Sequence, residues 1–114
     1  MIRRGEVYWV NLDPTVGSEA DKTRPALIVS NDINNEHAAT VTVLVLSSQL
    51  KRIYPFEVFL SKTATGLPDD SKAMAHQIRT IDKRRLIGQP LAPSLGDDLM
   101  ERIEAAIKLH LQLS

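Results

Sequence analysis

The stretch that decides the fold is TVTVLVLSS, residues 40–48. It is apolar, rich in β-branched residues and bounded by polar ones, a pattern that is typical of a β-strand. Similar but shorter patterns lie on both sides of it. They predict further strands at residues 6–12, 25–30, 55–60, 73–81 and 86–89. Several short strands separated by turns favour a mainly β fold, a small antiparallel barrel or half-barrel.

The segments between these strands carry turn signals. Asp13-Pro14 ends the first strand, because proline cannot extend a ladder and favours a turn. Residues 15–24 then form a polar loop, and residues 33–39 are expected to form one or two helical turns. Residues 62–71, which contain Gly66 and Pro68, are predicted to be a loop.

The chain changes character after residue 94. Ser94 is a suitable N-cap, with Asp97 three residues later. Apolar residues then recur at helical spacing, so a helix is predicted over residues 95–113. This helix must bury its apolar stripe against the sheet. Because so small a barrel has little core of its own, dimerisation is expected to supplement it.

Length and composition narrow the class of protein. With 114 residues, 43% of them hydrophobic and 25% charged, the chain is expected to be one domain spanning residues 1–114. It has no apolar run long enough to cross a membrane and no signal-peptide pattern at residues 1–10. It has no cysteine, and therefore no disulfide framework and no thiolate metal site. These features predict a cytoplasmic protein.

Charge is neutral overall but uneven along the chain. Residues 51–93 hold eight Lys or Arg against four Asp or Glu, whereas the segments on either side are net acidic. Such a basic stretch is either a solvated surface or a face that attracts a polyanion. The three histidines are scattered, and the acidic pairs Asp69-Asp70 and Asp97-Asp98 are adjacent residues that do not face one another. No metal site is therefore expected.

The segment GSEADKTRP, residues 17–25, carries Arg24 to the start of a predicted strand. The fork of donors on an arginine suits phosphate, and functional side chains concentrate on loops that a rigid scaffold holds. An alternative is that Arg24 is only a surface ion-pair partner of Asp21 or Glu19. Trp9 and Phe56 could belong to the core or could stack on bases.

Four segments, in order, resemble one known family. They are RRGEVYWVNLDPTVGSE at residues 3–19, RPALIVSND at 24–32, YPFEV at 54–58 and QIRTIDKRRL at 77–86. Together with the C-terminal helix, they are similar to the MazF/PemK toxin endoribonucleases of type II toxin–antitoxin systems. The resemblance covers essentially the whole chain.

The resemblance implies an SH3-like antiparallel barrel of the CcdB/PemK kind with a C-terminal helix, assembled as a homodimer. It implies sequence-specific, metal-independent cleavage of single-stranded RNA by an mRNA interferase, with no cofactor. The ribose 2′-hydroxyl would attack the adjacent phosphate, leaving a 2′,3′-cyclic phosphate and a 5′-hydroxyl. It also implies a cognate MazE-like antitoxin as partner.

Site residues follow from the resemblance by position. Arg24 would be the catalytic arginine, and Ser47 stands where many members have a catalytic threonine. Ser48 is a second hydroxyl that could share this role. Ser18 and Glu19 match loop residues that touch RNA, and Gln77 matches a base-contacting position. His76 stands where relatives often have an acidic residue, and it is either a proton carrier or a structural strand histidine. Lys51 and Arg52 lie in a loop that often tunes sequence choice.

Two other functions remain open at this stage. Toxins of the CcdB type share the barrel but poison DNA gyrase by protein contact, without the Arg-Pro loop that this chain has. A catalytically inactive binding module would retain the fold, and serine in place of threonine at position 47 keeps that alternative open.

Overall fold

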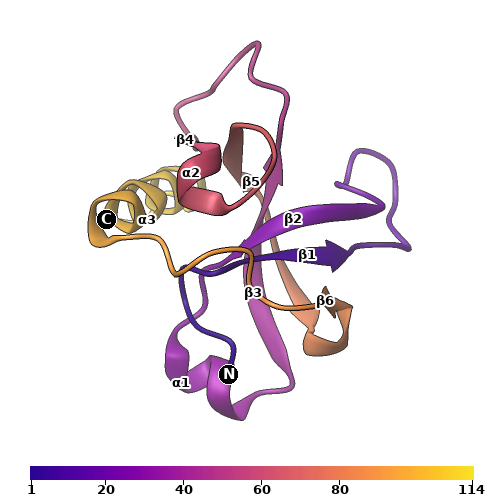
Figure 1. Cartoon of the computed structure of the whole chain (residues 1–114). Helices are drawn as coiled ribbons and strands as arrows, with labels where there is room; N and C mark the ends of the chain where they lie inside the picture. The colour runs from indigo at the N-terminus through magenta and orange to yellow at the C-terminus, as the bar shows by residue number, and fades with distance from the viewer.

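The fold consists mainly of β-strands (Figure 1). The computed structural model describes residues 1–114. The strands are β1 (Val7–Asn11), β2 (Thr23–Ile28), β3 (Thr40–Ser47), β4 (Glu57–Leu60), β5 (Ser71–Asp82) and β6 (Leu86–Ile87). The helices are α1 (Asp32–His37), α2 (Lys62–Thr65) and α3 (Asp97–Leu111), with a 3-10 turn η1 (Lys83–Arg85).

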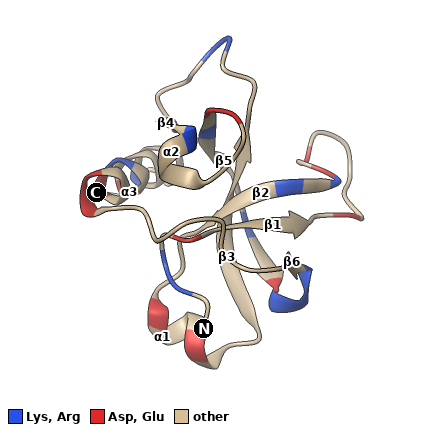
Figure 2. Cartoon of the chain, in the orientation of Figure 1, with Lys and Arg blue, Asp and Glu red and all other residues tan.

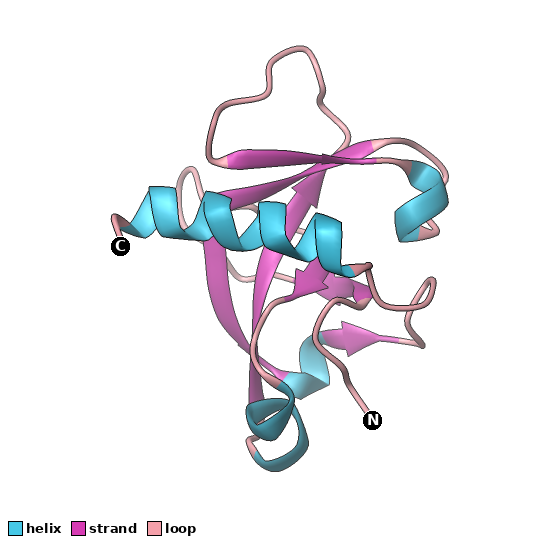
Figure 3. Ribbon diagram, turned by 90° about the vertical axis from the view of Figure 1, so that its left-hand side faces the viewer, coloured by secondary structure: helices cyan, strands magenta, loops and turns pink.

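All six strands form one antiparallel sheet in the order β4-β5-β3-β2-β1-β6. The sheet curls strongly, and α3 lies across one of its faces (Figure 3). The curl is accompanied by an irregularity in the central pair of strands. Leu44 of β3 lies opposite Ile78 and the next residue, Val45, lies opposite Met74, so residues 75–77 bulge from β5. The predicted mainly β barrel with a C-terminal helix is confirmed.

The central strands bury both of their faces, because successive side chains of a strand point to opposite sides. In β3, Leu44 and Leu46 belong to one core cluster, whereas Val43 and Val45 belong to a second cluster on the other face. The first cluster lies under α3, which contributes Met100, Ile103 and Ala106. This double burial explains why residues 43–46 form a continuous apolar run.

The start of α3 differs from the sequence prediction. Gly96, not Ser94, is the N-cap, no side chain caps the helix, and α3 begins at Asp97. The preceding segment is held in another conformation by strand-like hydrogen bonds. Leu91 N donates to Val7 O at 3.0 Å and Leu95 N donates to Gly5 O at 2.9 Å. Leu95 is buried by this arrangement, so the helix cannot begin earlier.

Two further boundaries were predicted wrongly. The expected loop at residues 62–71 contains helix α2, which Ser61 caps by accepting a hydrogen bond from Ala64 N. Gly66 closes it in the left-handed conformation, with φ of 80°. β2 begins at Thr23, so Arg24 lies within the strand and not on the preceding loop. Its position is therefore fixed by pairing with Val10 of β1.

Candidate active site

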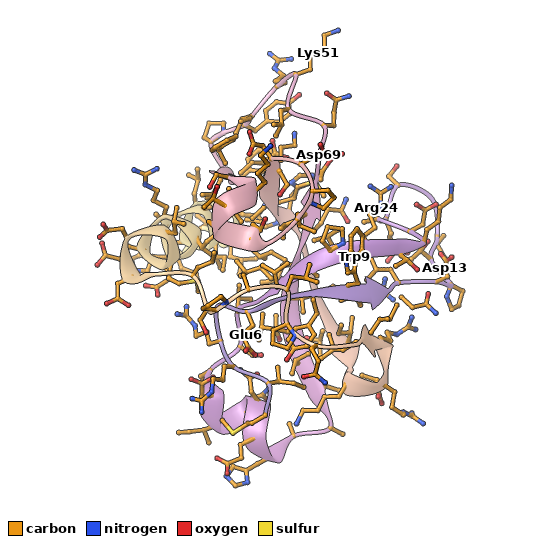
Figure 4. The ribbon with its side chains drawn as sticks, viewed as in Figure 1. Glu6, Trp9, Asp13, Arg24, Lys51 and Asp69 are labelled. Carbon is orange, nitrogen blue, oxygen red and sulfur yellow. The ribbon has the colours of Figure 1, made fainter.

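A pocket of about 260 Å³ opens where β1, β2 and β3 meet the loop before β5. Side chains from four separate parts of the chain line it. Trp9 and Arg24 come from neighbouring strands, and Asp69 lies beside them on the loop before β5 (Figure 4). Leu46 and Leu67, which also belong to the core, line the pocket as well. The pocket is thus supported by the core of the barrel.

Arg24 is the only arginine that lines this pocket. Its Nε donates to Asp21 O at 3.1 Å, and its Nη2 lies 3.5 Å from Asp21 Oδ1. The surface ion pair that the sequence allowed is therefore present, with the Arg24 side chain 40% exposed. Asp21 contacts the Nε and Nη2 edge, while Nη1 makes no hydrogen bond within the chain. Asp21 thus fixes the orientation of the guanidinium, and the N–H groups that it does not contact can donate to an anion.

Ser47 and Ser48 line the same pocket as Arg24. Ser47 is the last residue of β3 and is half-buried, whereas Ser48 is exposed. The Oγ of Ser47 accepts a hydrogen bond from Gln49 N at 3.1 Å, which leaves its own proton free to donate. The structure thus brings together the arginine and both hydroxyls that the sequence singled out.

Glu19, His76 and Gln77 gather elsewhere, at a second, smaller pocket of about 170 Å³. His76 and Gln77 lie in the bulge of β5, where residues have no partner on β3. Gln77 Oε1 accepts a hydrogen bond from Ala20 N at 3.1 Å, and Gln77 Nε2 lies 3.4 Å from Ser18 O. Gln77 therefore ties β5 to the loop between β1 and β2.

The loop between β1 and β2 also contains an internal contact. Glu19 Oε1 accepts a hydrogen bond from Val16 N at 2.7 Å, and both Ser18 and Glu19 are exposed. The loop then leads directly into β2 and Arg24. Ser18 and Glu19 therefore lie close to Arg24 in the sequence, but they do not line the main pocket.

Aromatic residues surround His76. Phe56 stacks on Tyr54 with ring centroids 5.4 Å apart, and His76 meets Phe56 edge-on at 4.9 Å. His110 of α3 completes the cluster, 6.4 Å from His76. Phe56 also packs against the core, as Trp9 does, so both residues serve as partly exposed core residues.

Lys51 and Arg52 lie on the loop between β3 and β4, which carries basic residues at its tip (Figure 2). Lys51 lies at the top of the view in Figure 4, well away from Arg24. Lys51 and Arg52 are both exposed, and the Arg52 guanidinium lies 5.1 Å from the centroid of the Tyr54 ring. With Lys72 they line a separate open hollow. The predicted site residues therefore occupy three places: the main pocket, the second pocket and this loop.

Sequence reasoning missed two residues of the main pocket. Asp69 was considered only as half of an acidic pair, and Ser71 was not considered. Ser71 is 2% exposed, and its Oγ has no hydrogen-bond partner. A loop residue and the first residue of a strand give no periodic signal, so only the fold could place them beside Arg24. No three His, Cys, Asp or Glu side chains are grouped so that they could hold a metal ion.

No helix in the structure has the length and apolar character needed to span a membrane.

Comparison with known proteins gives a consistent result over nearly the full length. The sequence profile of the PemK-like, MazF-like toxins of type II toxin–antitoxin systems matches residues 3–111. The chain belongs to this toxin family.

Two curated members of the toxin family are close in sequence. The chain is 45% identical to endoribonuclease MazF9 of Mycobacterium tuberculosis, over 99% of this chain and 98% of that protein. It is 35% identical to endoribonuclease EndoA of Bacillus subtilis, over 99% of this chain and 97% of that protein. Among solved structures, a mycobacterial endoribonuclease in complex with its cognate antitoxin is 28% identical and superposes with a TM-score of 0.81. The match covers 100% of this chain and 98% of that chain.

Proposed function

We propose that this toxin is an endoribonuclease that cuts single-stranded RNA at a specific short sequence without a metal ion. The 2′-hydroxyl of one nucleotide would attack the adjacent phosphate and expel the 5′-oxygen of the next. The products would be a 2′,3′-cyclic phosphate and a 5′-hydroxyl. The observation that carries this proposal is the pocket shared by Arg24, Ser47 and Ser48. The relatives named as endoribonucleases support it.

The chemistry assigns a role to each side chain. The free donors of Arg24 stabilise the charge that builds on the phosphoryl oxygens, where preorganised donors have their largest effect. The hydroxyl of Ser47 donates to the same phosphate or aligns the attacking group. Asp69 accepts hydrogen bonds only, so it faces the sugar hydroxyls or base amino groups of the RNA and not its phosphates.

Recognition of the RNA sequence is assigned to the second pocket and to the two loops. Single-stranded RNA exposes base edges, which Gln77, His76 and Glu19 can contact, and aromatic rings such as Tyr54 can stack on bases. The hydroxyls of Ser18 and Ser48 would contact the RNA between the second pocket and Arg24. Lys51 and Arg52 supply positive charge for the backbone of the RNA.

Replacing Gln77 with leucine is expected to raise the KM for RNA by about three- to tenfold, because the loop between β1 and β2 loses two side-chain hydrogen bonds. Steady-state cleavage of a short RNA measures this change. Gln89→Leu, on an exposed residue after β6, serves as the control and should behave as the wild type. An unchanged KM in Gln77→Leu would remove Gln77 from RNA recognition.

We further infer that two copies of the chain form a homodimer and that a MazE-like antitoxin covers the RNA site, all in the cytoplasm. Large apolar side chains exposed on β4 and at the end of α3 support the dimer; Phe59 is 45% exposed and Leu109 is 56% exposed. Light scattering on the protein as it elutes from a size-exclusion column should give twice the chain mass of 12.7 kDa. A monomer at micromolar concentration would contradict the dimer.

Cleavage of a long RNA of known sequence, with excess EDTA, tests the proposed function. Discrete cuts at one short sequence, with 5′-hydroxyl ends that polynucleotide kinase can label directly, are expected. Cuts that require a divalent metal, or that leave 5′-phosphates, would contradict it. A folded protein that leaves RNA intact but inhibits DNA gyrase would be a toxin of the other class.

A further inference from the structure

Glu57 and Lys72 form a buried ion pair to which the roles proposed above assign no function. Lys72 Nζ lies 3.0 Å from Glu57 Oε1, and the two side chains are only 8% and 2% exposed. They come from neighbouring strands, with Glu57 at the start of β4 and Lys72 near the start of β5. Burying two charges has a large desolvation cost, so such a pair is weak support for stability. The pair also binds two backbone groups of a neighbouring loop.

Both members of the pair hold the backbone of the loop between β3 and β4, residues 48–56. Lys72 Nζ donates to Arg52 O at 2.7 Å, and Glu57 Oε1 accepts from Tyr54 N at 2.9 Å. These two anchor points lie on either side of Ile53, at the part of the loop that carries Lys51 and Arg52. A backbone hydrogen bond from Glu57 N to Tyr54 O, 2.9 Å long, closes the same turn.

Lys72 is also the strand partner of a residue of the proposed active site. In the pairing of β3 with β5, Lys72 lies directly opposite Ser47. Ser71, the residue before it, lines the main pocket with Arg24. The same short segment of β5 therefore borders the main pocket and fixes the 48–56 loop.

We propose that Glu57 and Lys72 act as a buried latch that fixes the 48–56 loop, so that Lys51 and Arg52 are held ready to bind the RNA backbone. They are positioning residues and do not touch the RNA themselves. Their effect on RNA binding rests on the proposed function, whereas their effect on the loop does not. Fixing the backbone that carries these two basic side chains lowers the entropy that is lost when RNA binds.

Trypsin tests the latch without any RNA. Trypsin cuts after exposed lysine and arginine, so Lys51 and Arg52 report whether the loop opens. The variant Lys72→Met/Glu57→Leu removes both anchors and leaves no buried charge. We expect cleavage after Lys51 or Arg52 to become at least about tenfold faster. Circular dichroism and thermal melting verify that the variant is folded.

A matched control removes another ion pair without touching this loop. Arg4 and Glu104 pair at 3.1 Å between the N-terminal segment and α3, and Arg4→Met/Glu104→Leu leaves the net charge equal to that of the latch variant. Cleavage after Lys51 or Arg52 should keep its wild-type rate there. A wild-type rate in the folded latch variant would overturn the proposal.

A second variant covers the case in which the first does not fold. Lys72→Met/Glu57→Gln keeps an acceptor for Tyr54 N and releases only the carbonyl of Arg52. Faster trypsin cleavage after Arg52 is again expected, and an unchanged rate again contradicts the latch.

Kinetics with RNA then test the consequence for binding. In the latch variant the KM should rise by about five- to tenfold, while kcat stays within about twofold, because the pocket with Arg24 is intact. In a Lys51→Ala/Arg52→Ala background, the latch substitutions should add nothing further to KM. An equal rise in KM in both backgrounds would show that the pair acts on something other than these basic residues. If the wild type cuts no RNA, the proposed function fails, and the trypsin result still decides whether the latch exists.

Discussion

Arg24→Ala is expected to lower RNA cleavage by about a thousandfold while the protein stays folded. The side chain is 40% exposed and pairs with Asp21 at the surface, so its loss leaves no cavity and no buried charge. What is lost is the set of donors that is proposed to bind the phosphate in the pocket. Single-turnover cleavage at saturating protein measures the effect on the chemical step, free from changes in binding.

Two controls make the Arg24 result specific. Arg84 of η1 has a side chain that is 91% exposed, and Arg84→Ala should leave cleavage unchanged. Arg24→Lys keeps the charge but loses the planar fork, so we expect it to recover only a small part of the activity. Wild-type cleavage by Arg24→Ala would place the active site elsewhere.

Ser47→Ala is expected to slow cleavage by about ten- to a hundredfold, through the loss of one hydroxyl at the pocket. Ser48→Ala should change the rate by less than about twofold, because Ser48 lies beyond the end of β3 and is not held by pairing. The main hydrogen bond that Ser47 makes is with Gln49 N, an exposed contact, so the variant should fold normally. Cleavage rate constants of the wild type, Ser47→Ala and Ser48→Ala, measured on the same RNA, compare the two hydroxyls directly.

A threonine at position 47 sharpens this test. Ser47→Thr restores the methyl group that restricts the rotamer, so its rate should equal or exceed that of the wild type. Equal rates in the wild type, Ser47→Ala and Ser48→Ala would remove the hydroxyl from the mechanism. A larger loss in Ser48→Ala than in Ser47→Ala would exchange their roles.

The sheet could be predicted well from the sequence, for a physical reason. The middle of β3 is buried on both faces, so Val43, Leu44, Val45 and Leu46 give an unbroken apolar signal. The body of α3 was predicted as well, because its buried residues recur at helical spacing. The start of α3 was not, since hydrogen bonds from Leu91 and Leu95 to the distant N-terminal segment override the local capping signal at Ser94.

The candidate site was predictable only in part. The motif that contains Arg24 and the end of the strongest strand both gave local signals, and the structure brings them into one pocket. The separate position of Gln77 and His76 depends on the bulge in β5, which the sequence does not reveal. Asp69 and the Glu57–Lys72 pair depend on contacts between separate segments, and no local pattern marks such residues.

The most direct test of the account uses an RNA with one altered sugar. Once the cut is mapped, the nucleotide before it is replaced by its 2′-deoxy form, which removes the proposed attacking hydroxyl and nothing else. If the 2′-hydroxyl is the attacking group, this RNA binds with nearly unchanged affinity and is not cut at that position. Cleavage of the 2′-deoxy RNA there would show that water attacks the phosphate, and would contradict the proposed mechanism.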